Sequence, residues 1–196
     1  MKNKKEFNYA PIKSFLKHLF DSFADRQDFF EREGIFGTPR RVFHAWEEAL
    51  SGYKMNPKEL LKTSFAEDLN GYDQIIVLKD IDFVSTCEHH LLPFFGTASI
   101  GYLPDKKVVG ISKLARLVEC FARRLQIQER MTESIKEQIN THLNPRGVGV
   151  IIEAQHFCIT SRGIKKQKAK MVTSAFSGLF LAEDTVKSEF LRLIGK

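Results

Sequence analysis

The sequence has few cysteines and no long apolar run. Its 196 residues include three cysteines, Cys87, Cys120 and Cys158. So few, and an odd number, do not form the disulfide framework of a secreted domain, and we interpret them as reduced thiols, free or metal-bound. No apolar run approaches the roughly 20 residues that span a bilayer, and the first residues, M-K-N-K-K-E-F, lack the apolar stretch of a secretory signal. We therefore expect a cytoplasmic protein with no membrane partner.

The sequence also lacks a strong excess of one charge. It has 30 Lys and Arg against 24 Asp and Glu, a net charge of +6. This balance favours anionic partners but does not distinguish nucleic acid from a small phosphorylated ligand. A nucleic-acid-binding module would need basic residues spread over one face. The one dense basic run, Lys165 to Lys170, is interpreted as a loop, so we expect no nucleic-acid partner.

Hydrophobic spacing divides the chain into a helical arm and a mixed region. Apolar residues at three-and-four spacing predict helices over 11–30 and from Pro39 to about Gly52. Alternating residues predict strands over 74–84, 94–103 and 147–160 and near 171–176, with helices from Ser112, about Gln128 and about Asp184. We predict a helical region over residues 1–73 and a domain over residues 74–196. Its α+β fold would be an antiparallel sheet with helices on one face.

The stretch S-T-C-E-H-H-L-L-P-F, residues 85–94, gathers metal-binding side chains at the end of a predicted strand. Cys87 and His90 have C-x-x-H spacing, which lets both reach one ion from a single loop. The alternative interpretation is a buried thiol beside two loop histidines.

A second group of such side chains ends the predicted strand G-V-G-V-I-I-E-A-Q-H-F-C-I-T. Because side chains alternate across a strand, His156 and Cys158 should continue its apolar face. Cys87, His90 and Cys158 would leave a fourth position of a zinc ion open, as in catalytic sites. A fourth ligand from His89 or His156 would instead make the site structural. Cys120 is interpreted as a packing residue.

Charged residues at two helix starts are candidates for binding an anionic ligand. Ser112 is predicted as an N-cap, with Lys113 and Arg116 on one face of the first turn, which is either a solvated polar face or a cradle for phosphate. Arg162 follows Cys158 closely, and Arg41 is a weaker candidate. Glu129 either stabilises the first turn of its helix or accepts the paired N–H donors that guanine presents.

Taken together, five motifs resemble the GTP cyclohydrolase I family over nearly the whole chain from about Pro11. They are T-P-x-R, C-E-H-H, G-I-S-K-L-A-R, Q-E-R and H-x-C-x-x-x-R-G-I, in that order. The resemblance implies a tunnelling fold of β-β-α-α-β-β units that assemble into barrels, after an N-terminal helical arm. It also implies a homo-oligomer, in this family commonly a toroidal decamer, with pockets between subunits.

The resemblance further implies roles for particular residues. One zinc ion per subunit would be held by Cys87, His90 and Cys158, and His89 and His156 would be catalytic. The substrate GTP would be bound by the remaining candidates, Glu129, Gln128, Ser112, Lys113, Arg116, Arg162 and Arg41. In the family's reaction, zinc-activated water adds to C8 of the purine, formate leaves, and 7,8-dihydroneopterin triphosphate forms for folate or other pterin synthesis.

Two departures from the family pattern accompany this resemblance. Phe157 stands where members often have tyrosine, and K-M-V-T-S-A-F-S-G replaces a run richer in Thr and Ser. A related zinc enzyme acting on another purine or pterin, and a zinc-stabilised nucleic-acid module, are the alternative functions. A zinc nucleobase deaminase would need H-x-E with P-C-x-x-C, and neither motif is present.

Overall fold

The computed structural model describes residues 8–23, 32–62, 64–65 and 73–196. Contacts divide the chain into two units, residues 1–49 and residues 50–196. None of the helices described is both long enough and apolar enough to cross a membrane.

The first unit is helical. Its elements are α1 (Ala10–Phe23), α2 (Glu33–Phe36) and α3 (Thr38–Ala49). Helix α3 packs against α1 and α2, and the ring of Tyr9 meets Phe43 edge-on at 5.7 Å. The predicted first helix is confirmed as far as Phe23, and residues 24–30 of that prediction lie outside the described residues. Helix α1 buries none of its residues.

The second unit contains a five-stranded sheet of order β5-β2-β3-β6-β7. These strands are β5 (Leu125–Gln126), β2 (Ile76–Cys87), β3 (Pro93–Leu103), β6 (Gly147–His156) and β7 (Met171–Gly178). Neighbours are antiparallel except β2 and β5, which are parallel. The α+β class is therefore confirmed, but the sheet is mixed, not purely antiparallel. A separate two-stranded sheet pairs β1 (Ser64–Phe65) with β4 (Val108–Val109).

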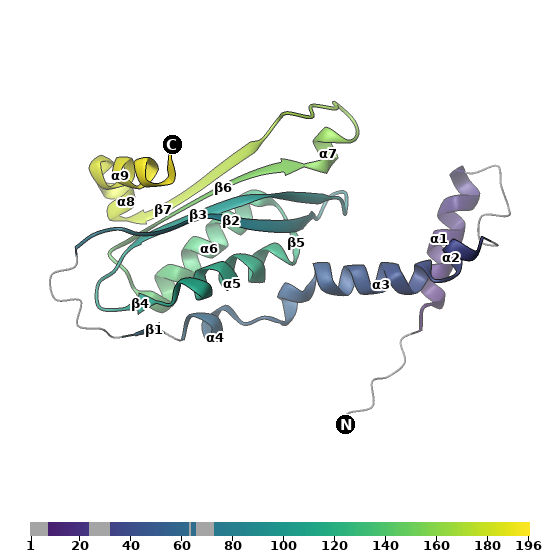
Figure 1. Cartoon of the computed structure of the whole chain (residues 1–196), viewed down its shortest axis with the longest axis horizontal. Helices are drawn as coiled ribbons and strands as arrows, with labels where there is room; N and C mark the ends of the chain where they lie inside the picture. The colour runs from purple at the N-terminus through teal and green to yellow at the C-terminus, as the bar shows by residue number, and fades with distance from the viewer. Residues whose placement is uncertain (1–7, 24–31, 63, 66–72) are drawn as a thin grey trace, which may run out of the picture. The chain divides into compact units, whose positions relative to one another are not determined.

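Helices cover both faces of the sheet, which corrects the prediction of helices on one face (Figure 1). Helices α5 (Ile111–Ala122) and α6 (Gln128–Leu143) pack on one face. Helices α8 (Leu179–Ala182) and α9 (Asp184–Ile194) bury Phe180 and Phe190 against the other. A Cβ at Gly101 would lie 2.6 Å from Phe190 and one at Gly149 2.7 Å from Phe180. Glycine at these strand positions therefore lets the aromatic rings reach the sheet.

Strand β6 ends at His156, two residues before Cys158, where the sequence predicts a strand up to residue 160. Its last partner on β3 is Phe94, and β7 pairs only as far as Ala154. Because buried backbone groups need partners, residues beyond this point bond locally, and the Ser161 amide donates to the Phe157 carbonyl at 3.0 Å. The result is a one-turn helix, α7 (Phe157–Thr160). Cys158 therefore projects from a helical turn.

The start of the second unit is more ordered than its turn-rich sequence indicates. A 3-10 turn, η2 (Ser51–Lys54), precedes α4 (Pro57–Leu61). The Asn56 side chain caps α4 by accepting from the Lys58 amide at 3.0 Å, and Pro57 occupies the first turn. Helix α4 packs against α5 and α6. The predicted boundary between residues 73 and 74 separates a helical region from a domain that acts in catalysis. The division into two units is based on contacts alone and does not test which segments act in catalysis, so this boundary stays a prediction.

Candidate active site

One thiol–imidazole cluster joins the two distant parts of the predicted metal site. The ligand atoms of Cys87, His90 and Cys158 all lie within 4.8 Å of one another. Cys87 Sγ is 3.9 Å from His90 Nδ1. Cys87 ends β2, His90 lies in the following turn, and Cys158 comes from α7. The strand β3 between β2 and β6 brings these segments together.

The chemistry of the cluster fits a soft divalent metal. With ordinary Zn–S and Zn–N bonds, two tetrahedral ligand atoms lie about 3.6 Å apart, close to the separation between Cys87 and His90. Burial, and then the neighbouring Cys87 sulfur, raise the pKa of the Cys158 thiol, while Arg162 acts in the opposite direction. Two adjacent thiolates repel each other, and a bound cation would remove this cost.

A tight turn after β2 places His90. The Leu91 amide donates to the Cys87 carbonyl at 2.8 Å, and the Cys87 amide donates to the Leu92 carbonyl at 2.9 Å. Leu91 adopts a positive φ of 55° within this turn. His89 Nδ1 lies 4.0 Å from Cys87 Sγ, yet His89 does not belong to the three-residue cluster. Its imidazole is exposed beside the cluster.

His156 lies beside the cluster with its ring held on two sides. It stacks on Phe94 at a centroid distance of 4.5 Å, and its Nε2 is 2.8 Å from Gln128 Oε1. Burial lowers the pKa of His156, and the nearby carboxylate of Glu129 acts in the opposite direction. The ring is therefore favoured in its neutral form at the end of β6.

Gln128 determines which nitrogen of His156 carries the proton. Its amide nitrogen donates toward the Ile152 carbonyl at 3.0 Å, the Met171 carbonyl at 3.1 Å and Thr173 Oγ1 at 3.1 Å. The amide oxygen must then face His156, so His156 Nε2–H is the donor and Nδ1 is unprotonated in the neutral ring. Gln128 is only 1% exposed.

Two hydroxyl groups that the sequence analysis did not select complete this arrangement. Thr173 Oγ1 lies 2.7 Å from Thr132 Oγ1, and the Thr132 hydroxyl also contacts the Gln128 carbonyl at 2.8 Å. Thr132 faces inward one turn after Gln128 on α6, and Thr173 lies on β7. No local sequence pattern distinguishes them from ordinary packing threonines, so only the register of the sheet identifies them.

Glu129 and Arg162 lie near the same cluster and are exposed. Glu129 is in the first turn of α6, directly after Gln128, and it is close enough to influence His156 electrostatically. Arg162 follows α7 and is close enough to influence Cys158. Glu129 is thus close to His156, and Arg162 is close to Cys158.

The other cationic candidates of the second unit lie elsewhere. Helix α5 begins at Ile111 with Gly110 as its N-cap, so the prediction of Ser112 as the N-cap is wrong. The Lys113 amide already donates to the Gly110 carbonyl at 2.8 Å, which places Ser112 inside the first turn. Ser112 and Arg116 are exposed.

The direction of α5 separates this first turn from the metal cluster. The C-terminal end of α5 leads into β5, and Gln126 of β5 pairs with Cys87. The first turn lies at the other end of the helix, beside β4 (Figure 1). A helix of 12 residues is about 18 Å long. Along the axis, Lys113 lies about 14 Å and Arg116 about 9 Å from Ala122, the last residue of α5, so both are displaced from the end that leads toward Cys87.

Arg41 belongs to the first unit. Its guanidinium donates to Thr38 Oγ1 at 2.9 Å and to the Gly34 carbonyl at 2.5 Å. These two hydrogen bonds connect the first turn of α3 to α2.

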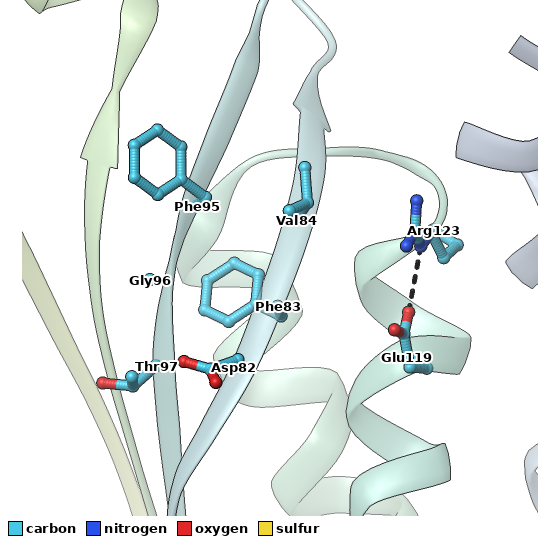
Figure 2. Close-up of a pocket in the computed structure, with 8 residues that line it drawn as sticks. All are labelled: Asp82, Phe83, Val84, Phe95, Gly96, Thr97, Glu119 and Arg123. Atoms are coloured by element: carbon cyan, nitrogen blue, oxygen red, sulfur yellow. Dashed lines mark hydrogen bonds and ion pairs between the residues drawn. The ribbon is translucent and has the colours of Figure 1, made fainter. Parts of the chain in front are cut away.

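One pocket of about 390 Å³ lies away from the predicted residues (Figure 2). It is lined by residues 82–84 of β2 and 95–97 of β3, with Glu119 of α5 and Arg123, the residue that follows α5. Arg123 Nε donates to Glu119 Oε2 at 3.0 Å across its edge. None of the predicted site residues lines this pocket.

The sequence matches known proteins over most of its length. Residues 16–195 match the family model described as GTP cyclohydrolase I. The chain is 52% identical over 166 residues to GTP cyclohydrolase 1 of Chlorobaculum tepidum, covering 84% of this chain and 73% of that protein. It is 50% identical over 176 residues to GTP cyclohydrolase 1 of Wolinella succinogenes, covering 90% and 91%.

Two further matches differ in weight. GTP cyclohydrolase 1 of Campylobacter lari is 51% identical over 164 residues, covering 84% of this chain and 85% of that protein. A crystal structure of an archaeosine synthase, QueF-Like, matches 53% of this chain and 93% of its own at 21% identity and a TM-score of 0.43. That last likeness is too weak to carry an argument.

Proposed function

The chain belongs to the GTP cyclohydrolase I family and is a GTP cyclohydrolase, and we propose that zinc held by Cys87, His90 and Cys158 serves its reaction. The reaction opens the imidazole ring of GTP, releases formate and yields 7,8-dihydroneopterin triphosphate. The observation that carries the zinc assignment is the convergence of two sulfurs and one imidazole nitrogen within 4.8 Å. One zinc ion per chain is expected.

The three ligands leave room for a catalytic function of the metal. A zinc ion bound by three protein ligands lowers the pKa of a water molecule and thereby supplies a nucleophile near neutral pH. Neither His89 nor His156 belongs to the cluster in the described part of the chain, and their imidazoles remain for proton transfer. Reduced thiol ligands also suit a cytoplasmic location.

His156 is the proposed proton donor to the purine. Because Gln128 fixes its Nε2–H, Nδ1 is the nitrogen that takes up a proton and passes it to the substrate. Gln128 would thus act through His156, with its own amide fully occupied. His89, exposed beside Cys87, is proposed to assist proton transfer during ring and ribose chemistry.

Glu129 is the proposed acceptor for the guanine edge. Its carboxylate is exposed at the start of α6, next to the residue that holds His156. A carboxylate can accept two parallel N–H donors, which matches the ring N–H and amino group of guanine. Arg162, on the rim near Cys158, is proposed to contact the phosphates.

The remaining phosphate-binding residues are proposed to come from a second copy of the chain. Ser112, Lys113 and Arg116 lie in the first half of α5, about 9–15 Å along the helix axis from the end that leads to the cluster of their own chain, and Ser112 and Arg116 are exposed. Self-association with a tunnelling fold, in a toroidal decamer, would place this turn of one copy beside the cluster of another. Arg41 of the first unit is a further proposed contact.

Incubation with GTP tests the function directly. Zinc-loaded protein should release formate and form a fluorescent pterin, and a chelator should abolish both products, with recovery when zinc is restored. Absence of turnover in a sample that contains stoichiometric zinc would contradict the proposed function.

A further inference from the structure

The first turn of α6 carries three consecutive residues, Gln128, Glu129 and Arg130, that face different surroundings. Gln128 points inward to His156, Glu129 is exposed at the rim, and Arg130 reaches the loop that follows Cys87. Successive residues on a helix point about 100° apart, so neighbours in sequence can serve separate partners. The function proposed above uses Gln128 and Glu129 but leaves Arg130 without a role.

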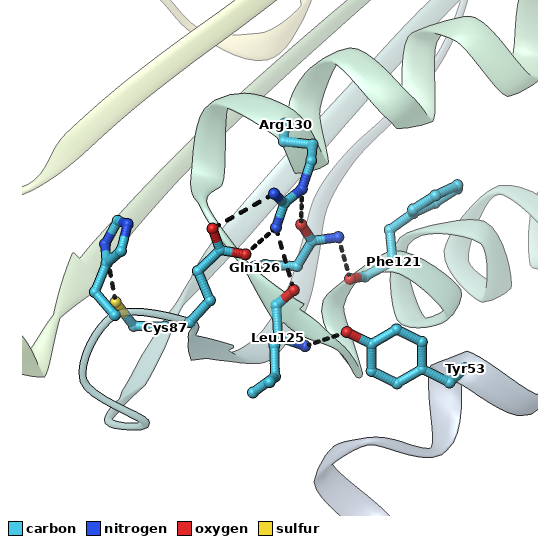
Figure 3. Close-up of polar contacts among 8 residues, drawn as sticks. Tyr53, Cys87, Phe121, Leu125, Gln126 and Arg130 are labelled. Atoms are coloured by element: carbon cyan, nitrogen blue, oxygen red, sulfur yellow. Dashed lines mark hydrogen bonds and ion pairs between the residues drawn. The ribbon is translucent and has the colours of Figure 1, made fainter.

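The guanidinium of Arg130 binds three groups outside its own helix (Figure 3). Its terminal nitrogens form an ion pair with the Glu88 carboxylate, and NH1 lies 3.4 Å from Glu88 Oε1. Its Nε donates to Gln126 Oε1 at 3.2 Å, and NH2 also lies 3.3 Å from the Leu125 carbonyl. Arginine suits this arrangement because its planar fork donates in several directions at once.

The groups that Arg130 binds lead directly to the metal cluster. Glu88 follows Cys87 in the chain and lies two residues before His90. The Glu88 amide donates to the Gln126 carbonyl at 3.1 Å, so the loop is also joined to β5 through the backbone. The two metal-ligating residues of this loop are thereby connected to the helix that carries Glu129.

Strand β5 is itself fixed on its other sides. Gln126 Nε2 donates to the Phe121 carbonyl at 3.0 Å, and the Leu125 amide donates to the Tyr53 hydroxyl at 3.3 Å (Figure 3). Gln126 is 4% exposed. Arg130 therefore binds the Glu88 loop against a fixed support, which a surface ion pair between two mobile side chains would lack.

We infer that Arg130 is a positioning residue that, through Glu88, holds the loop of Cys87 and His90 in register with Glu129. This inference rests on the proposed function, because it states that the guanidinium of Arg130 maintains the distance between the proposed metal and Glu129, the proposed guanine acceptor. Residues that orient metal ligands without touching the metal typically change affinity or activity 10–100-fold when replaced. A group that only stabilises the fold would change neither constant of the folded enzyme.

The test compares Arg130→Gln with Arg146→Gln in the full-length protein. Arg146 forms an ion pair with Asp73, and the exposed fractions of the two arginine side chains are similar, 48% and 43%. Zinc affinity is measured by competition with a chromophoric chelator, and kcat and KM for GTP are measured on zinc-saturated samples. We expect Arg130→Gln to weaken zinc binding about 10-fold or more and to lower kcat about 10–100-fold, with Arg146→Gln unchanged.

A second variant keeps the inference testable if Arg130→Gln does not fold. Glu88→Gln retains an acceptor oxygen but loses the charge, and it should show the same pattern at smaller size. Zinc affinity, kcat and KM within twofold of the Arg146→Gln values, in a folded Arg130→Gln or otherwise in Glu88→Gln, would overturn the inference. An inactive, zinc-loaded wild-type protein would instead contradict the proposed function, so the two failures are distinguishable.

Discussion

The two ends of the second unit differ in how much of a site one chain completes. At one end, the turn after β2, the start of α6 and α7 converge, and Cys87, His90 and Cys158 already lie within 4.8 Å of one another. At the other end, the first half of α5 presents Ser112, Lys113 and Arg116, and none of these three belongs to the cluster of metal-binding side chains found among the described residues. One folded chain therefore brings the three proposed metal ligands together, whereas we propose that the phosphate-binding residues of α5 act on the site of a second copy.

The difference follows from the kind of contact that holds each end. Around the cluster, side chains bond to one another through Gln128, Thr173 and Arg130, and the backbone pairs across β2, β3 and β6. The first turn of α5 is anchored by apolar packing through the buried Leu114, and its N-cap makes no side-chain hydrogen bond. Preorganised side chains can hold reacting groups in a fixed geometry, whereas an exposed cationic turn can bind an anionic group but does not position a reaction.

The largest expected effect is at the metal end. Replacing Cys158 by Ser removes a soft ligand, so zinc and activity should be lost together. Each should fall by more than the roughly 100-fold loss of metal affinity or activity that follows replacement of residues that only support ligands. Zinc content by atomic spectroscopy and formate release measure both quantities. Retention of stoichiometric zinc by this variant would show that Cys158 is not a ligand.

Replacing His156 by Ala should separate proton transfer from metal binding. Because His156 lies outside the three-residue cluster, zinc should remain bound, while ring opening should fall about 10²–10⁴-fold. Single-turnover formate release is the measurement. Loss of zinc from this variant would identify His156 as a fourth ligand and would contradict the open position proposed for the metal.

The double change Lys113→Ala with Arg116→Ala tests the other end. Each charge-assisted contact to a phosphate contributes about 1.5–3 kcal/mol, so kcat/KM for GTP should fall at least about 100-fold in total while zinc affinity stays unchanged. Steady-state kinetics beside chelator competition give both values. A change in zinc affinity comparable to that of Cys158→Ser would break the distinction between the two ends.

A smaller effect is expected from Thr173→Val. This change removes the hydroxyl that contacts Gln128 and Thr132, but Gln128 keeps two carbonyl acceptors for its two amide hydrogens. The free energy of unfolding should fall by about 1 kcal/mol, with kcat lowered only severalfold. Denaturant unfolding checks the first value, with the exposed neighbour Ser174→Ala as the control. A loss of zinc would show that the network supports the metal, not His156.

The smallest effect is expected for Glu153, which serves neither end. Lys170 and Lys196 lower the pKa of Glu153 to about 2 from an ordinary value of 4.5. The folded state therefore favours the charged form, which adds stability above about pH 4.5 that is lost as the pH falls toward 2. Because the ion pairs are near the surface, Glu153→Gln should lower the free energy of unfolding by less than about 1 kcal/mol at neutral pH. It should also weaken the dependence of that free energy on pH between about 4.5 and 2. Unfolding measured from pH 7 to pH 2 checks this, and altered zinc affinity or KM would contradict it.

Much of the metal end could be predicted from the sequence because its signals are local. C-E-H-H places two of the clustered side chains within one turn, and the sequence predicts the third at the end of an alternating strand. The same reasoning misplaced the end of that strand, because β6 loses its partners after His156 and Cys158 reaches the cluster from a helical turn. Cys158 nevertheless lies within 4.8 Å of the ligand atoms of Cys87 and His90, because both conformations carry it to the same end of the sheet.

Other features depended on contacts between segments far apart in sequence. Helices cover the second face of the sheet because Gly101 and Gly149 leave room for the rings of Phe190 and Phe180. No periodicity in the sequence indicates that these glycines and phenylalanines pack together. The roles of Thr173 and Arg130 follow from the register of β7 and from the parallel pairing of β5 with β2. Motif spacing also could not show that Ser112 and Lys113 lie at the end of α5 that points away from β5 and Cys87.

Mixing two inactive variants tests most directly whether one site is shared by two copies. Cys158→Ser protein and Lys113→Ala, Arg116→Ala protein are combined under conditions that allow subunit exchange, and formate release is compared with the sum of the separate samples. In random mixed oligomers, about a quarter of the sites would pair an intact metal end with an intact α5 turn, so activity should reappear at that level. Demonstrated subunit exchange without any gain in activity would contradict the account, because it would mean that each chain supplies both halves of its own site.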